Sequence, residues 1–211
     1  MVSNDLTRLP LSAKGMTIGL FGGSFNPPHP GHQLVSRQVL KRLDLDAVWW
    51  LVTPGNPLKD HGELAPLANR VQAARTLITH PRVSATGFEA TRGFTYTFDT
   101  LKFLKTTLPD RNFVWIMGAD SFANFHHWER WREIANLMPL VIYNRPGAGF
   151  DALSSPAAIY LKKHRLSQRA AKTLPFCKPP AWIYLSGLTS EMSSSKIRQN
   201  APLPAKPVER I

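Results

Sequence analysis

The sequence has little cysteine, and this scarcity limits its covalent and metal chemistry. Cys177 is the only cysteine among the 211 residues. A single thiol excludes an intrachain disulfide, and it also excludes a zinc site built from several thiolates. The composition fits the reducing cytosol, so we expect a cytoplasmic location.

Long hydrophobic runs are lacking as well. The segment AVWWLV at 47–52 is among the longest strongly apolar ones, whereas a helix needs about 20 apolar residues to cross a bilayer. The first residues, MVSNDLTRLPLSAKG, lack the apolar stretch of a signal peptide. We therefore expect no export and no membrane partner.

Acidic residues are few compared with basic ones. Lys and Arg total 26 against 14 Asp and Glu, which gives a formal net charge of +12. This balance favours an anionic partner, whether nucleic acid, acidic lipid or a phosphorylated small molecule. The basic residues are scattered, with LKKHR at 161–165 the densest cluster, so most of them fit a solvated surface with a few phosphate contacts.

Short apolar runs alternate with longer amphipathic segments along the chain. Hydrophobic residues make up 43% of the sequence, as is ordinary for a globular protein. Strands are predicted at 16–21, 47–52, 82–89, 112–119, 139–146 and 181–185. Helices are predicted at about 31–43, 66–80 and 95–108, in the Trp-rich stretch up to Ala135, and from the segment 192–198. This alternation predicts an α/β fold, a Rossmann-like doubly wound parallel sheet covered on both faces.

No linker divides the chain, so we expect a single domain over residues 15–200. Residues 1–14 show no clear periodicity and are expected to be a poorly ordered lead-in. The segment 151–173 is polar, basic and weakly helical, and the Pro-rich tail 201–211 is not expected to pack.

The stretch FGGSFNPPHPGH at 21–32 follows the first predicted strand directly. Loops at the carboxyl ends of parallel strands bind ligands, and Gly22 and Gly23 permit close approach of the backbone. A helix that starts near Pro30 offers free N–H groups to an anion. His29 and His32 are three residues apart, so both can donate to phosphate oxygens. The alternative is a pair of capping or core histidines.

The better-known phosphate and metal motifs are absent. The sequence contains neither GxxxxGK[ST] nor GxGxxG, which disfavours a P-loop kinase and a dinucleotide-binding dehydrogenase. The histidine pair lacks HExxH spacing and an obvious third ligand, so no residue is assigned to a metal.

Two distant elements together resemble a known superfamily. GGSFNPPHPGH resembles the histidine-containing element of the HxGH nucleotidyltransferases, and MSSSKIR at 192–198 resembles their C-terminal ISSTxIR element. Four further segments resemble the nicotinate-nucleotide adenylyltransferases: TPGNPLKD at 53–60, EATRGFTYTFDTLKFL at 89–104, WIMGADSFANFHHW at 115–128 and NRPG at 144–147. Asn26, Met192 and Ser195 differ from the usual residues but keep their size or hydrogen-bonding capacity.

The resemblance implies adenylyl transfer from ATP to nicotinate mononucleotide, which gives deamido-NAD and pyrophosphate in NAD biosynthesis. The attacking phosphate is already anionic at pH 7, so no general base is needed, and Mg²⁺ would accompany ATP, held mainly by substrate and water. ATP and nicotinate mononucleotide are the expected partners, nucleic acid is not, and a homo-oligomer is compatible with the sequence.

The resemblance also implies roles for individual residues. Catalytic contacts to phosphate are expected from His29, His32, Lys59 and Arg198. The ATP site is expected to include Gly22, Gly23, Ser24, Phe25, His29, His32, Asp120, Ser193, Ser194, Ser195 and Arg198. The nicotinate nucleotide is expected to contact Thr86, Thr95, Tyr96 and Trp128.

Some of these residues have structural alternatives. Trp128 is expected to stack on the pyridine ring, but Trp128 and Trp131 could instead be packed in the core from one helix. Asp120 is expected to contact a ribose hydroxyl, and it could instead cap a helix.

Two other functions remain open from the sequence. The first is transfer of a nucleotidyl group to another phosphorylated acceptor, such as nicotinamide mononucleotide or phosphopantetheine. The second is a basic nucleic-acid-binding protein on the same fold, which predicts salt-dependent binding to RNA or DNA.

Overall fold

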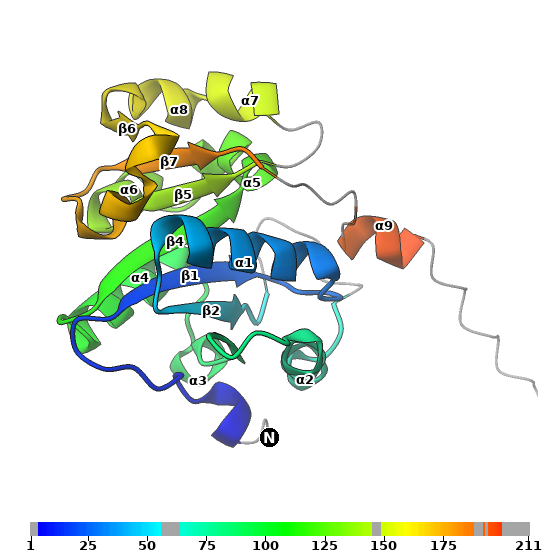
Figure 1. The fold of residues 1–211 in the computed structure, drawn as a ribbon. Coiled ribbons are helices and arrows are strands. Elements are labelled where there is room, and N and C mark those ends of the chain that lie inside the picture. Colours follow the sequence, from blue (N-terminus) through cyan, green and yellow to red (C-terminus); the bar gives the residue numbers. More distant parts are fainter. Residues whose placement is uncertain (1–3, 56–63, 145–148, 188–191, 193, 200–211) are drawn as a thin grey trace, which may run out of the picture.

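One parallel sheet forms the centre of the protein. The computed structural model describes residues 4–55, 64–144, 149–187, 192 and 194–199. Within these residues, seven strands pair in the order β3-β2-β1-β4-β5-β7-β6, and all of the pairs are parallel (Figure 1). The predicted doubly wound α/β fold is confirmed, and the short strand β6 is an addition that the sequence did not predict.

The strands are β1 (Thr17–Gly23), β2 (Ala47–Val52), β3 (Val83–Thr86), β4 (Asn112–Gly118), β5 (Leu140–Tyr143), β6 (Arg165–Leu166) and β7 (Trp182–Leu185). The α-helices are α1 (Pro30–Leu43), α2 (Leu67–Leu77), α3 (Glu89–Arg92), α4 (Thr97–Thr107), α5 (Ala119–Ala123), α6 (Trp131–Leu137), α7 (Gly149–Ser154), α8 (Pro156–Tyr160) and α9 (Ser194–Gln199). Short 3-10 helices are η1 (Asn4–Thr7), η2 (Phe125–His127), η3 (Lys162–His164) and η4 (Gln168–Phe176).

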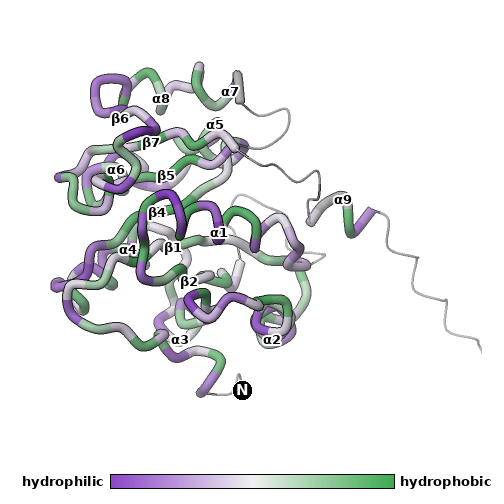
Figure 2. Tube along the Cα trace, viewed as in Figure 1, coloured by the Kyte–Doolittle hydropathy of each residue, from purple (hydrophilic) through white to green (hydrophobic). Residues whose placement is uncertain are grey.

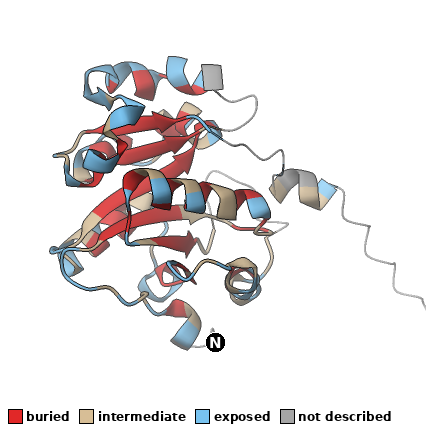
Figure 3. Cartoon of the chain, in the orientation of Figure 1, coloured by how far each residue is buried: buried red, intermediate tan, exposed pale blue. Residues whose placement is uncertain are grey.

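Each face of the sheet has its own hydrophobic core. One core joins strand residues such as Leu20 and Trp115 to α4, α5 and α6. The other joins Phe21 and Val114 to α1, α2 and η4. Neighbouring strand residues point to opposite faces, so strands that are buried on both faces carry apolar residues at almost every position. The red colour of the strands in Figure 3 shows this burial.

The apolar residues of α1 have the spacing of a helix that packs one side against the sheet. The buried residues of α1 include Val35, Val39, Leu40 and Leu43, which share one side of a helix because of their spacing. The mixed hydrophilic and hydrophobic colours along α1 in Figure 2 reflect this two-sided character. Asp44 ends the helix in the left-handed conformation, with φ of 58°.

The strand order reverses direction between β1 and β4. The chain adds β2 and β3 on one side of β1, and it then adds β4 and β5 on the other side. In open α/β sheets, the crevice at such a reversal, beyond the carboxyl ends of the strands, is the usual ligand site. The loops that follow β1 and β4 therefore lie where a ligand is expected.

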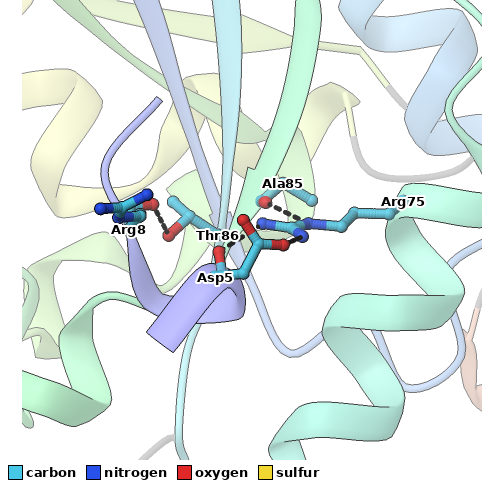
Figure 4. A network of polar contacts seen from close by, with 5 residues as sticks. All are labelled: Asp5, Arg8, Arg75, Ala85 and Thr86. Atoms are coloured by element: carbon cyan, nitrogen blue, oxygen red, sulfur yellow. Dashed lines mark hydrogen bonds and ion pairs between the residues drawn. The ribbon is translucent and has the colours of Figure 1, made fainter. Parts of the chain in front are cut away.

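The expectation of a poorly ordered lead-in is wrong for residues 4–14. Gly87 N donates to Leu6 O at 2.9 Å, and Thr86 Oγ1 donates to Arg8 O at 2.7 Å. Arg75 Nη1 also forms an ion pair of 2.6 Å with Asp5 Oδ2 (Figure 4). These bonds attach the segment beside β3, an edge strand that would otherwise leave backbone groups unpaired.

The polar stretch 151–173 is more regular than its sequence suggested. It contributes most of α7, then α8, η3, β6 and part of η4. Ala157, Ala158 and Leu161 are buried there and belong to the same core as α5. Among the described residues, no helix has both the length and the hydropathy that crossing a membrane requires.

Candidate functional site

The two histidines of the opening motif lie together at the start of α1. His29 is the N-cap residue and His32 occupies the first turn. Their ring centroids are 3.8 Å apart, and His29 N donates to His32 Nδ1 at 3.1 Å. The side chains are 2% and 8% exposed, respectively. The pair thus combines the predicted place at a helix start with a capping role that the sequence left as an alternative.

The aromatic rings of Phe25 and Trp50 pack against His32. Phe25 packs against Trp50 with ring centroids 4.9 Å apart and an interplanar angle of 11°. The ring of Phe25 is also 4.7 Å from that of His32. Phe25 is 1% exposed, so its predicted contact to ATP is limited to its backbone. The buried ring explains why a non-glycine residue is held here at φ of 46°, a costly conformation for a bulky side chain.

The two glycines that end β1 are required by aromatic packing. A Cβ atom on Gly22 would lie 2.2 Å from Trp115 Cη2, and one on Gly23 would lie 3.3 Å from Phe25. Both glycines were predicted from the sequence to permit close approach of the backbone to a phosphate. In the structure, the indole of Trp115 occupies the space where a side chain at Gly22 would project.

A cavity of about 320 Å³ opens at the carboxyl ends of β1, β2 and β4. Predicted residues that line it are Gly22, Gly23, Ser24, Thr95, Tyr96 and Trp128. A larger cavity of about 1030 Å³ lies near the amino ends of β2 and β3, lined partly by Asp46 and Arg82. Only the smaller cavity lies at the strand-order reversal, and it is the candidate substrate site.

Trp128 and Trp131 have different roles, and they are not on one helix as the sequence suggested. Arg130, between them, adopts φ of 56° and interrupts the helical path before α6. Trp131 is 8% exposed and belongs to the core. Trp128 lines the cavity and meets Trp115 edge to face, with centroids 6.5 Å apart. Tyr96, also at the cavity, is 44% exposed.

Thr86 and Asp120 lie at strand ends but are absent from the lining of this cavity. Thr86 is 1% exposed, and its hydroxyl donates to Arg8 O. Only the backbone of Thr86 could therefore contact the nicotinate nucleotide. Asp120 is exposed in the first turn of α5, whose N-cap is Gly118. The capping alternative for Asp120 is therefore wrong.

The C-terminal element is brought to the histidine loop. Ser194 Oγ donates to Pro27 O at 2.8 Å, and Arg198 Nη1 donates to Asn26 O at 2.6 Å. Figure 1 shows α9 beside the end of α1 where that helix begins. Ser195 lies in the first turn of α9, whereas Lys59 and Ser193 lie outside the described residues.

Several residues that line the cavity were not predicted from the sequence, among them Glu89 and His127. Glu89 is 7% exposed and accepts a hydrogen bond of 2.7 Å from Thr100 Oγ1. Burial raises the pKa of this carboxyl, while the hydroxyls of Thr100 and Thr53 oppose the shift. His127, next to Trp128, also lines the cavity. The available signal for Glu89 was a charged residue at the end of the apolar segment 82–89.

The described residues contain no group of three His, Cys, Asp or Glu side chains that could hold a metal ion.

Comparison with known proteins shows the family to which the chain belongs. A family model described as cytidylyltransferase-like matches residues 20–200. A "Probable nicotinate-nucleotide adenylyltransferase" of Methylorubrum extorquens is 54% identical over 183 residues, which cover 87% of this chain and 99% of that protein. Another, of Mesorhizobium japonicum, is 49% identical over 193 residues, with 92% and 99% covered. The chain belongs to the nicotinate-nucleotide adenylyltransferase family. It is a nucleotidyltransferase, as the paired motifs implied.

Solved structures support the fold of this adenylyltransferase. The nicotinic acid mononucleotide adenylyltransferase of Plasmodium falciparum, solved in complex with NaAD, superposes with a TM-score of 0.67. Its sequence is 18% identical, and the match covers 87% of this chain and 83% of that one. At this identity the likeness concerns the fold alone.

Proposed function

We propose that the enzyme transfers the adenylyl group of ATP to nicotinate mononucleotide, giving deamido-NAD and pyrophosphate. Family membership supports the reaction class and this acceptor. The observation that carries the proposal is that two phosphate-type motifs, far apart in the sequence, meet at one end of the sheet. Ser194 and Arg198 donate to the loop between β1 and α1 that leads to His29.

The proposed reaction is a substitution at the α-phosphorus of ATP. A phosphate oxygen of the acceptor forms a bond to the α-phosphorus of ATP, while the bond from that phosphorus to the bridging oxygen breaks. The bonding electrons leave with pyrophosphate. The nucleophile needs no deprotonation, so catalysis consists of positioning and charge neutralisation.

We assign these tasks to donors at helix starts. His29 and His32 donate to phosphate oxygens from the fixed first turn of α1. Arg198 neutralises charge, and Lys59 is proposed for the same task. Ser193, Ser194 and Ser195 bind the β and γ phosphates together with the backbone there. Gly23 and Ser24 contact the nucleotide through their main chain.

The cavity beside this site takes the acceptor. Trp128 provides an aromatic face for the cationic pyridine ring, held against Trp115. Thr95 and Tyr96 line the same cavity, and the backbone near Thr86 is proposed for the carboxylate. Asp120, exposed at the end of β4, is proposed to contact a ribose hydroxyl.

Mg²⁺ is proposed to enter with ATP. When bound, it would supply positive charge to offset that of the triphosphate. The phosphates and water would supply most of its ligands, in keeping with the absence of a three-ligand cluster among the described residues.

A panel of acceptors tests the choice of substrate. Pyrophosphate release from ATP is measured with nicotinate mononucleotide, nicotinamide mononucleotide and phosphopantetheine. We expect the highest kcat/KM with nicotinate mononucleotide. No turnover with it would contradict the proposal. Turnover with phosphopantetheine alone would support the alternative of adenylyl transfer to another phosphorylated acceptor.

Partners and location belong to the same proposal. Nucleic acid and membranes have no part in it, and the net charge of +12 attracts anionic substrates. A cytoplasmic location is proposed on the basis of the single cysteine. A homo-oligomer remains a prediction, which size-exclusion chromatography with light scattering would check.

A further inference from the structure

One buried cation joins the loop after β1 to the loop after β2 at the edge of the site. Arg70, in the first turn of α2, is 2% exposed. Burial lowers the pKa of its guanidinium. Such burial is costly for a cation unless its N–H groups are hydrogen bonded. The partners that meet this cost show what Arg70 holds in place.

The described partners of the guanidinium are all backbone carbonyls. Nε donates to Ala65 O at 2.7 Å, and Nη1 donates to Ser24 O at 2.8 Å and to Thr53 O at 2.7 Å. Nη2 donates to Pro54 O at 3.2 Å. Four of the five N–H directions of arginine can be used in this way.

These carbonyls belong to the backbone that builds the site. Ser24 lies in the loop between β1 and α1, and Thr53 directly follows β2. Both residues line the candidate cavity, whereas Arg70 does not. Arg70 therefore lies behind the wall of the cavity. Its guanidinium contacts the wall residues Ser24 and Thr53 at their main-chain carbonyls.

A second set of bonds extends this arrangement to α9. Ala65, bonded to Arg70 through its carbonyl, donates from its backbone N to Asn26 Oδ1 at 3.3 Å. The carbonyl of Asn26 accepts from Arg198 Nη1. The path from α2 to α9 thus crosses the loop that leads to His29, and every link is a hydrogen bond between defined atoms.

We propose that Arg70 is a positioning residue for adenylyl transfer, which fixes the loops after β1 and β2 relative to each other. It rests on the proposed function, and it adds a residue that contacts neither substrate. Lysine cannot replace it, because an ammonium group is compact and its three donors cannot span four carbonyls on two separate loops.

The same helix offers a matched control. Arg75 is also on α2, and it donates to Ala85 O at 3.2 Å and to Asp5 O at 2.8 Å. These contacts lie at β3 and the N-terminal segment, not at the loops after β1 and β2 (Figure 4). Arg70→Lys and Arg75→Lys make the same chemical change on one helix, with different loops affected.

Two measurements on these variants test the proposal. Arg70→Lys is expected to lower kcat/KM roughly 100-fold, as small misplacements of reacting groups do, while Arg75→Lys stays within about threefold. Thermal unfolding of both variants shows whether a loss of stability accounts for the difference. Methylguanidinium added to Arg70→Ala is expected to restore part of the lost activity.

Hydrogen exchange provides a readout that does not depend on the substrate. The backbone amides of Ser24, Phe25, Asn26 and His29, and those of Thr53 and Gly55, are expected to exchange roughly tenfold faster in Arg70→Lys but not in Arg75→Lys. If the wild type shows no turnover with nicotinate mononucleotide, the proposed function fails, and exchange still decides the role of Arg70. Equal exchange and equal activity in the two variants would overturn the proposal.

Discussion

At the residue scale, His32 has one ring nitrogen committed to structure. Its Nδ1 accepts from His29 N at 3.1 Å, and this bond helps to close the start of α1. The proposed phosphate contact uses the other nitrogen. In His32→Asn, the side-chain oxygen takes the place of Nδ1 and nothing replaces Nε2. We expect kcat/KM to fall by about 100-fold or more, with Tm lowered by less than about 4 °C.

His80 provides the control for this substitution. Its Nδ1 accepts from Arg82 N at 3.2 Å, away from the candidate site. His80→Asn is expected to preserve both activity and Tm. If His32→Asn retained wild-type kcat/KM, the catalytic role of His32 would be wrong and its capping role would be sufficient.

Gly22 is the residue at which space is most restricted. Its missing side chain leaves room for Trp115 Cη2, 2.2 Å from where a Cβ would be. Gly22→Ala is expected to lower the free energy of unfolding by about 1–3 kcal/mol, because the indole must move. Urea unfolding measures this loss, and Gly23→Ala should cost less, since its nearest contact is 3.3 Å.

A second substitution tests the cause of that loss. Trp115→Phe removes the outer part of the indole, so it should recover part of the stability lost in Gly22→Ala. Strictly additive effects of the two changes would contradict the packing explanation.

The buried carboxyl of Glu89 predicts a pH dependence of stability. Burial raises its pKa in the folded protein above the usual 4.5, so the folded state binds this proton more tightly than the unfolded state. Stability from this group is fully present below pH 4.5 and is lost as the pH rises through the folded-state pKa. Glu89→Gln cannot ionise, so we expect it to gain stability relative to the wild type over that pH range.

Glu133 is the opposite case and serves as the comparison. Its pKa is lowered, chiefly by the hydrogen bond from Arg130, so its contribution disappears as the pH falls. Urea unfolding of Glu89→Gln and Glu133→Gln between about pH 2 and 8 measures both trends, since the contribution of Glu133 is lost below pH 4.5. If the difference between Glu89→Gln and the wild type did not change with pH, Glu89 would not titrate as described.

At the scale of elements, the strands were the most predictable part. AVWWLV at 47–52 is β2 without any change of boundary, because a strand buried on both faces is apolar at each position. The segment 82–89 was predicted as one strand, but β3 ends at Thr86 and α3 starts at Glu89. Local pattern cannot separate these, since the buried Glu89 is stabilised by Thr100 from another helix.

The parts that the sequence did not predict depend on contacts between distant segments. Arg70 lies on an amphipathic helix, where an arginine ordinarily faces solvent, and only the assembled loops show its carbonyl partners. The site motifs were found because their spacing is local. Trp115 was missed as a cavity residue because it reads as an ordinary core residue of β4.

The N-terminal segment makes the clearest prediction at this scale. Residues 4–8 supply partners to Arg75, Thr86 and Gly87 at the edge of the sheet. Deleting residues 1–9 is expected to lower Tm by about 3–8 °C, because edge contacts of a few kcal/mol are lost. Differential scanning calorimetry measures this, and an unchanged Tm would show that the segment does not stabilise β3.

At the scale of the whole molecule, the topology explains where chemistry can occur. The loops after β1 and β4 lie at the reversal of strand order, and α9 contacts the loop after β1. The proposed function depends on this contact, since the histidine motif and α9 are proposed to share the phosphates of ATP. The excess of basic residues adds a general attraction for anions at the same time.

The fate of each phosphate of ATP tests adenylyl transfer most directly. The enzyme is given nicotinate mononucleotide and ATP labelled either at the α-phosphorus or at the γ-phosphorus, and the products are separated. We predict the α label in a dinucleotide whose mass matches deamido-NAD and the γ label in pyrophosphate. Transfer of the γ label to the acceptor, or release of the α label as free AMP, would contradict the account.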